Sequence, residues 1–313
     1  MENLESKRFD KKITCAYLYT ITRHGYPPPV EKTTEHIEEM AEMGFSSVEL
    51  EGIGKNNIQY LYENRKEIAA YLKRCEVEVP VLCLVLPRLG SADERKRKES
   101  LELFEKGCQV ASLFGAGGVL DNGPLPPFDY PANMPVMRHY TSDNLMQLSF
   151  PPEFCWDSYW ESLGETFREA CQLAASYGLL YHMHPCVGSL IANTDGFENF
   201  YRLTGSENLR FNLDTANQFL LKDNLSLSIA RLIEKVSYIH ISDNRGMQLE
   251  HLVPGEGAIP WDLFFKTLKD YGFNGSFAVD VGGAESDTGD IETAVLRTAR
   301  WLEAMISKYS LFK

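Results

Sequence analysis

Short apolar runs alternate with longer amphipathic stretches along most of the chain. The short runs are rich in β-branched residues, and each is followed by a segment with apolar residues at helical spacing. This order predicts strands that are each followed by a helix. The predicted strands are 13–19, 45–50, 78–86, 117–120, 179–184, 209–213, 236–241 and 276–281. The predicted helices are 33–43, 58–74, 92–114, 159–177, 197–203, 225–235, 261–271 and 291–308.

The number of these units indicates the fold class. Eight strand–helix units in 313 residues, with no evident linker, favour an α/β fold with one (β/α)₈ TIM barrel over residues 1–313. The near-continuous apolar run EVPVLCLVL suits a parallel strand that is covered on both faces. The alternative is a doubly wound open sheet, which usually carries a glycine-rich phosphate loop after its first strand. Because TITRHGYPPP is no such loop, the barrel is favoured.

One segment, at about residues 122–156, interrupts the alternation. It is irregular and rich in proline, and a loop of this length inside a compact domain is usually functional. It carries Arg138, His139, Trp156 and several other aromatic residues. Aromatic rings stack well on the C–H faces of sugars, so Trp156 is a candidate substrate-binding residue. The alternative is that these rings only fix the loop to the barrel.

The charge balance disfavours a nucleic-acid partner. The chain has 31 Lys and Arg against 44 Asp and Glu, which gives a net charge of −13. The basic run at residues 95–98 lies between acidic residues, and we interpret it as the solvated face of a helix. Without a strong basic cluster, a polyanion is an unfavourable partner.

Three observations predict a cytoplasmic protein. No apolar run reaches the roughly 18–20 residues that span a bilayer, so no membrane segment is expected. The N-terminal segment MENLESKRFDKK lacks the apolar stretch of an export signal. The seven cysteines show no CxxC motif and no regular spacing, which favours reduced thiols over a disulfide framework.

Candidate metal ligands fall near the ends of four successive predicted strands. In a TIM barrel the chemistry lies at the carboxyl ends of the strands. The fifth strand ends with His182 and His184, Asp214 follows the sixth, and His240 and Asp280 lie near the ends of the seventh and eighth. Each alone could be a core residue or a helix cap, but imidazole and carboxylate groups from adjacent strands together predict a divalent-metal site. We assign it to His182, Asp214, His240 and Asp280. His184 lies on the same face of its strand as His182, so either histidine can be the ligand.

Several motifs resemble those of a known family. The chain is similar to the sugar phosphate isomerase/epimerase family with a xylose-isomerase-like barrel, which includes ketose 3-epimerases and inosose isomerases and dehydratases. Endonuclease IV is a relative. The matching segments are GFSSVELEG, YHMHP, NLDTAN, IHISDNRG, PGEGAIPW and GSFAVDVGG.

The resemblance implies one divalent metal ion held by Glu, Asp, His and Glu on strands five to eight. Asp214 and His240 match two of these ligands, whereas His182 and Asp280 stand where the family has glutamates. Because nitrogen ligands disfavour Mg²⁺, Mn²⁺, Zn²⁺ or Co²⁺ is expected.

The same resemblance implies three substrate-binding residues. Arg245 matches a substrate-binding arginine of the family, and Asn217 stands where the family often has a histidine. Glu256 lies in a loop that usually closes near the site.

The expected substrate is a small carbohydrate, either a keto-sugar or a related polyol ketone. The expected reaction is isomerisation or epimerisation through a metal-bound enediolate, with Asp280 as the first choice of base and His184 as the second. Because both family glutamates are replaced, a metal-dependent dehydratase, hydratase or lyase acting on a keto-sugar, inosose or 3-keto-glycoside is the alternative. A non-catalytic sugar- or partner-binding barrel also stays open. The net charge disfavours an endonuclease IV-like enzyme. Because members of the family are often dimers or tetramers, the resemblance also implies a possible homo-oligomer.

Overall fold

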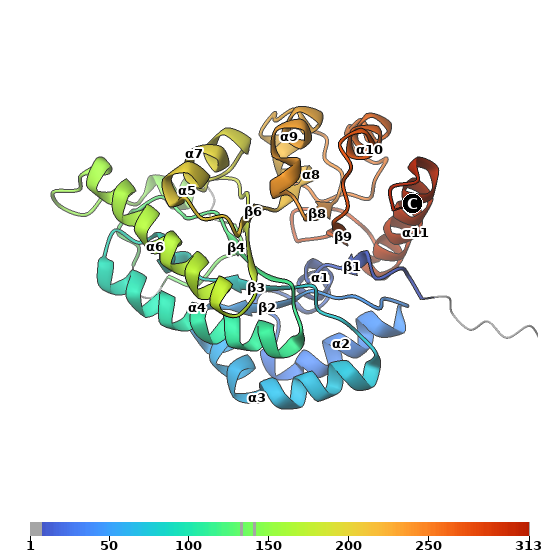
Figure 1. Ribbon diagram of the computed structural model, residues 1–313, viewed down its shortest axis with the longest axis horizontal. Coiled ribbons are helices and arrows are strands. Elements are labelled where there is room, and N and C mark those ends of the chain that lie inside the picture. The colour runs from blue at the N-terminus through green and yellow to red at the C-terminus, as the bar shows by residue number, and fades with distance from the viewer. Residues whose placement is uncertain (1–7, 132–133, 140–141, 313) are drawn as a thin grey trace, which may run out of the picture.

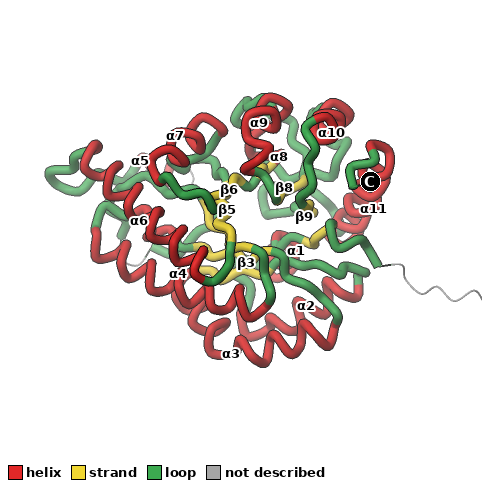
Figure 2. The backbone as a smooth tube through the Cα atoms, viewed as in Figure 1, coloured by secondary structure: helices red, strands yellow, loops and turns green. Residues whose placement is uncertain are grey.

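The computed structural model describes residues 8–131, 134–139 and 142–312 (Figure 1). Part of the segment that suggested the absence of an export signal, residues 1–7, lies outside this description. Parallel strands form the centre and helices surround them, as Figure 2 shows. The strands are β1 (Ile13–Cys15), β2 (Leu50–Ile53), β3 (Val81–Val85), β4 (Gly118–Asn122), β5 (Leu180–His184), β6 (Leu209–Phe211), β7 (Leu213–Asp214), β8 (Tyr238–Ile241) and β9 (Ser276–Val279).

Each predicted helical range contains a helix, and three shorter α-helices, at residues 18–24, 142–146 and 215–220, were not predicted. The α-helices of the described chain are α1 (Leu18–His24), α2 (Thr33–Glu42), α3 (Gly54–Cys75), α4 (Glu94–Phe114), α5 (Ser142–Met146), α6 (Trp156–Ser176), α7 (Thr194–Thr204), α8 (Thr215–Leu220), α9 (Leu225–Leu232), α10 (Trp261–Asp270) and α11 (Ile291–Tyr309). Short 3₁₀ turns occur at η1 (Val30–Lys32), η2 (Pro87–Gly90) and η3 (Ile233–Lys235). None of the described helices is long and apolar enough to cross a membrane.

The strands close into a barrel. Among the described residues, hydrogen bonds order them as β2-β3-β4-β5-β6 and as β1-β9-β8-β7. At one seam, the Cys15 amide donates to the carbonyl of Ser47 at 2.9 Å, and the Glu49 amide donates to the carbonyl of Cys15 at 2.9 Å. At the other seam, the chain itself passes from β6 to β7 through Asn212, whose amide donates to the carbonyl of Met183 at 3.0 Å. The expected TIM barrel is therefore confirmed.

Two strands differ from their predicted bounds by more than the others do. The apolar run 13–19 is a strand only to Cys15, because Leu18 and Tyr19 are buried in α1 and not in the sheet. The second strand was predicted over 45–50, but its ladder with β3 begins at Leu50. The residues before it make only isolated bridges, at Ser47 and Val48. An apolar pattern reports burial, and here it does not separate a strand from its buried flanks.

The barrel has two apolar regions. The larger region lies between the strands and the helices, and a small cluster fills the barrel interior. The inner cluster combines residues of β3 and β4, such as Cys83 and Leu120, with Tyr238 of β8 and Ala278 of β9. Because these strands face each other across the barrel, this layer forms a floor below the carboxyl ends of the strands.

The seven cysteines are all free thiols, and no disulfide links them. The basic run at 95–98 is only partly the solvated face that we predicted. Arg97 is buried, and its guanidinium donates to Thr166 Oγ1 at 3.0 Å and to the carbonyls of Ser91 and Ala92 at 2.8 and 3.1 Å. Because Thr166 belongs to α6, Arg97 fastens α4 to the neighbouring helix.

We predict that Arg97→Met lowers the free energy of unfolding by about 2–3 kcal/mol, because three acceptors lose a charged donor in a buried place. Arg95→Met is the matched control, since Arg95 is exposed and lies 3.9 Å from Asp93. It should change the free energy by less than about 0.5 kcal/mol. Urea denaturation of both variants measures the difference, and equal effects would contradict the structural role of Arg97.

Candidate active site

A polar cavity lies at the carboxyl ends of the strands. Residues in or beside β2, β3, β4, β5, β8 and β9 line it, with others from α1 and α8 and two from the irregular segment after β4, Arg138 and His139. The titratable side chains that matter most for its chemistry are Glu49, Glu51, His184, His240, His251 and Asp280. The site was predicted at this end of the barrel.

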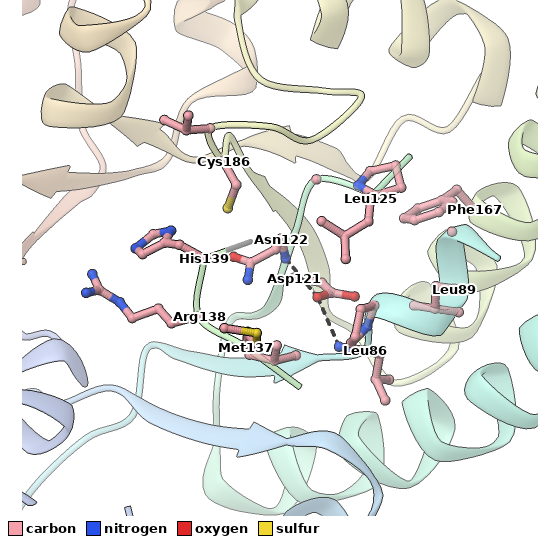
Figure 3. Close-up of a pocket in the computed structure, with 16 residues that line it drawn as sticks. Leu86, Leu89, Asp121, Asn122, Leu125, Met137, Arg138, His139, Phe167 and Cys186 are labelled. Carbon is pink, nitrogen blue, oxygen red and sulfur yellow. Dashed lines mark hydrogen bonds between the residues drawn. The ribbon is translucent and has the colours of Figure 1, made fainter. Parts of the chain in front are cut away.

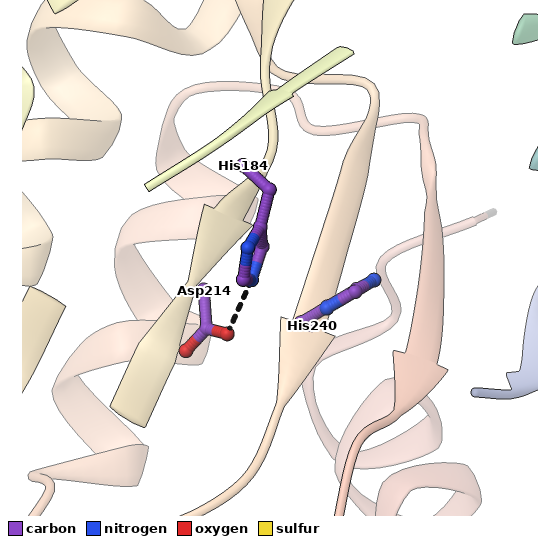
Figure 4. A group of neighbouring side chains, drawn as sticks. All are labelled: His184, Asp214 and His240. Atoms are coloured by element: carbon purple, nitrogen blue, oxygen red, sulfur yellow. Dashed lines mark hydrogen bonds and ion pairs between the residues drawn. The ribbon is translucent and has the colours of Figure 1, made fainter. Parts of the chain in front are cut away.

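Two overlapping groups of side chains at this end can hold a metal ion. The first is His184, Asp214 and His240, shown in Figure 4, and the second is Asp214, His251 and Asp280. In each group, one possible ligand atom per residue lies within 4.8 Å of the others. Asp214 belongs to both groups. The two groups therefore form one continuous cluster of three imidazoles and two carboxylates.

His240 and His184 are each held from the side that faces away from the cluster. His240 Nε2 lies 2.9 Å from Glu49 Oε1, and His184 Nδ1 lies 3.1 Å from Asn122 Oδ1. The opposite nitrogen of His240, Nδ1, lies 3.5 Å from Asp280 Oδ2 and has no hydrogen-bond partner in the described chain. The opposite nitrogen of His184, Nε2, lies 2.9 Å from Asp214 Oδ2.

His251 has the same arrangement. Its Nδ1 lies 3.1 Å from Glu285 Oε1, and its Nε2 lies 4.0 Å from Asp214 Oδ2 and 3.9 Å from Asp280 Oδ2. All three imidazoles thus have an outward nitrogen beside an oxygen acceptor and an inward nitrogen that faces the carboxylates. Histidines that bind metals are typically oriented in this way, because the outward hydrogen bond fixes the ring so that the inward nitrogen can bind an ion in place of the proton that it shares with a carboxylate.

The two carboxylates of the cluster stay ionised despite their burial. Burial by itself raises the pKa of Asp214, but the hydrogen bond from His184 and the nearby imidazoles outweigh it and lower the pKa below its usual value. Burial likewise opposes ionisation of Asp280, and His240 reverses this effect, so the pKa of Asp280 is also lowered.

Asp214 also caps a helix. Its Oδ1 accepts a hydrogen bond from the Asn217 amide at 2.8 Å, at the first turn of α8, and its Oδ2 accepts one from Asn217 Nδ2 at 2.8 Å. Asp214 can therefore be both a helix cap and a metal ligand, because Oδ1 accepts the capping hydrogen bond while Oδ2 also faces His184 Nε2 at 2.9 Å. Asn217, the expected substrate contact, lines the cavity but is bonded to Asp214 through both nitrogens.

This donor set fits a divalent cation. Two ionised, buried carboxylates repel each other, and a cation between them removes that repulsion. The unpartnered Nδ1 of His240 is aimed into the cluster and supplies a further lone pair. Mixed imidazole and carboxylate donors of this kind suit zinc, cobalt or manganese better than magnesium.

His182, which was assigned as a ligand, lies outside both groups. It lies one layer deeper than His184 on the inner face of β5, with its ring 6.1 Å from that of Tyr238 in the barrel floor. A Cβ atom at Gly118 would come within 2.8 Å of the His182 ring, which shows how closely it is packed. Burial lowers the pKa of His182 to about 3, so it is a neutral core residue. His184 holds the position that we expected for His182.

Three of the expected substrate-binding residues do not line the cavity. Arg245 donates to Glu250 Oε1 at 2.6 Å, and its side chain is 57% exposed. Glu256 pairs with Arg297 at 3.1 Å, and Trp156 stacks on Trp160 of its own helix at 5.4 Å between ring centroids. Their side chains are held by neighbours on other surfaces.

Sequence reasoning missed several residues of the site. Glu49 and Glu51 are two apart in GFSSVELEG, so both face the barrel interior, and this alternation was a usable signal. His251 and Glu285 lie in loops, where no periodic pattern marks them. Arg138 reaches from the irregular segment to Glu285 Oε1 at 2.5 Å and thereby connects that segment to the His251 side of the site.

Comparison with known proteins identifies the family and the fold. A family model described as xylose isomerase-like TIM barrel matches residues 37–305. Fructoselysine 3-epimerase of Escherichia coli O157:H7 is 22% identical over 192 residues, which cover 60% of this chain and 61% of that relative. The match thus spans less than two thirds of that relative's length. The chain belongs to the xylose isomerase-like TIM barrel family, which confirms the resemblance found in the motifs.

Solved structures show the same fold. Apo 3-keto-D-glucoside 4-epimerase YcjR from E. coli superposes with a TM-score of 0.69 at 18% identity, over 94% of this chain and 100% of that chain. The IOLI protein with a bound zinc atom superposes with a TM-score of 0.69 at 16% identity, over 95% and 98% of the two chains.

We predict that His184→Ala weakens zinc binding at least about 100-fold, because it removes an inward nitrogen from the cluster. His182→Ala is the control on the same strand, and it should leave the zinc stoichiometry unchanged because its ring belongs to the floor. Equilibrium dialysis with zinc measures both, after circular dichroism has shown that each variant is folded. Loss of zinc in His182→Ala alone would contradict the assignment of His184.

Proposed function

We propose that the protein is a divalent-metal-dependent sugar isomerase or epimerase that acts on a keto-sugar or related polyol ketone. The observation that supports this most strongly is the convergence of three oriented imidazoles and two ionised carboxylates at the barrel mouth. His184, Asp214, His240 and Asp280 would hold the ion. The family membership and the sugar epimerases among the similar proteins agree with this proposal.

The residues of the site can then be assigned roles in the reaction. A divalent cation held by these residues would polarise the substrate carbonyl and make the neighbouring C–H more acidic. Asp280 is the base that removes this proton, because it is ionised, lines the cavity and lies at the end of β9. Removal of the proton gives an enediolate, which is the common intermediate of isomerisation and epimerisation.

A second group must return the proton to a carbon atom. Burial raises the pKa of Glu51 to about 8, and the charge of Glu49 adds to the effect. Glu51 is therefore mostly protonated at pH 7 and can donate into the cavity that it lines. His184, our second choice of base from the sequence, suits this task less well. One of its nitrogens faces Asn122 and the other faces Asp214.

The unlike acid and base also favour a second candidate function. An ionised Asp280 and a protonated Glu51 differ from a symmetric pair of carboxylates that exchange roles. After Asp280 removes a proton, Glu51 can protonate a departing β-oxygen instead of a carbon. Dehydratase, hydratase or lyase chemistry on a keto-sugar, inosose or 3-keto-glycoside is thus the alternative. A cytoplasmic location and a homo-oligomer stay predictions from the sequence.

We expect the metal-loaded protein to incorporate one solvent deuterium next to the carbonyl of a keto-sugar without loss of water. Mass spectrometry and proton NMR of ketohexoses, inososes and 3-keto-glycosides measure this exchange. Loss of water or of an aglycone would indicate elimination. Full metal occupancy with neither reaction would support a binding protein and contradict both enzymatic proposals.

We predict that Asp280→Asn lowers the exchange rate at least about 100-fold, because an amide cannot accept the proton. The matched control is Asp270→Asn, since Asp270 is an exposed carboxylate of α10 that pairs with Lys266. The control should exchange at the wild-type rate. Metal content is measured in parallel. An unchanged rate in a metal-loaded Asp280→Asn protein would exclude Asp280 as the base.

A further inference from the structure

A second, largely apolar pocket adjoins the polar cavity (Figure 3). It lies over β3, β4 and β5, with Leu86 and Leu125 on its loop walls, Met137 from the irregular segment and Phe167 from α6. Val187 completes the wall after β5. Its lining includes one carboxyl group and one imidazole, whereas the lining of the polar cavity includes three carboxyl groups and four imidazoles.

The two pockets are adjacent. Both are lined by Val85, Asn122, Arg138, His139 and Cys186, so a group bound in one pocket lies next to the other. Asn122 is also the residue whose Oδ1 lies 3.1 Å from His184 Nδ1. An apolar substituent in the second pocket would therefore extend from a sugar held at the metal-ligand cluster.

The walls of this apolar pocket are fixed by close contacts. Tyr159 donates to the carbonyl of Gly90 at 2.8 Å, and the Leu190 amide donates to the carbonyl of Pro124 at 2.8 Å. A Cβ atom on Gly90 would lie 2.9 Å from Pro124 Cβ, so the loops after β3 and β4 are in direct contact. A pocket with such preformed walls binds an apolar group without the entropic cost of ordering loops.

The charges around the apolar pocket disfavour a phosphate group. Among the described residues that line it, Arg138 is the only Lys or Arg, and Glu285 engages its guanidinium at 2.5 Å. Burial lowers the pKa of His139 to about 3, so His139 is neutral. A phosphate in this pocket would lack the free cationic partner that such groups normally require.

The one carboxyl group at the base of the apolar pocket is mostly neutral as well. Asp121 Oδ1 accepts hydrogen bonds from the amides of Asn122 and Leu86 at 2.7 and 3.3 Å. Burial raises the pKa of Asp121 to about 8. The pocket is therefore suited to an uncharged occupant that is mainly apolar.

We propose that the substrate is a keto-glycoside with an aromatic aglycone, whose ring occupies this apolar pocket while the keto-sugar occupies the polar cavity. The inference rests on the proposed function, because that function places the sugar at the metal-ligand cluster. The thioether of Met137 and the ring of Phe167 are groups on which an aromatic ring packs favourably.

The test compares phenyl and methyl 3-keto-β-D-glucosides on the metal-loaded protein. The added ring should make the dissociation constant of the phenyl compound about tenfold lower, because its apolar surface leaves water. Isothermal titration calorimetry measures both constants. Equal affinities, or tighter binding of a ketose phosphate than of the phenyl compound, would overturn the inference.

Leu125→Trp fills the apolar pocket and should bring the two dissociation constants to within about twofold. Leu227→Trp is the matched control, because Leu227 lies on α9, is 55% exposed and lines neither pocket. It should keep the full preference. If thermal melting shows that Leu125→Trp is unfolded, Val187→Trp fills the same pocket from the β5 side. A preference that survives in the folded variant would overturn the proposal.

Deuterium exchange separates this inference from the proposed function. Exchange into the methyl compound reports on the chemistry alone, whereas the ratio of dissociation constants reports on the pocket alone. Exchange with no aromatic preference would reject the aglycone site and keep the isomerase proposal. An aromatic preference without exchange would keep the pocket and reject the chemistry.

Discussion

The site depends on keeping two carboxylates ionised inside the barrel. Asp214 and Asp280 are buried, and burial alone would favour their neutral forms. The imidazoles around them reverse this tendency. Asp214 has two roles in the structure, because its Oδ1 caps α8 while its Oδ2 faces His184. The helix cap thus fixes the position of the carboxylate that both possible ligand groups share.

The orientation of the imidazoles comes from parts of the chain that are distant in sequence. Glu49 before β2 holds His240, Asn122 at the end of β4 holds His184, and Glu285 after β9 holds His251. The barrel brings these acceptors together because parallel strands all end at the same rim. Closure of the sheet therefore fixes both the ligands and the groups that orient them.

The irregular segment after β4 belongs to the site through particular contacts. Arg138 reaches Glu285, which also holds His251, and the His139 ring stacks over the His251 ring at 6.4 Å. The same segment contributes Met137 to the apolar pocket. It thus forms a wall that is shared by the polar cavity and the apolar pocket, whereas Trp156, the aromatic residue that we selected from the sequence, packs against its own helix.

The sequence by itself determined the order of strands and helices, the barrel, and the strand ends that carry Asp214, His240 and Asp280. These features repeat along the chain with a regular period, so local patterns are enough to locate them. The choice between His182 and His184 was not determined in this way, because both lie on one face of β5 and only the stagger of the barrel strands sets their depth. His251, Glu285 and Arg138 lie on loops, which have no period, and only the tertiary structure brought them to the rim. The apolar pocket was likewise formed only by tertiary contacts between three loops and a helix. Its lining residues, taken one at a time, have no sequence feature that distinguishes them from other core residues.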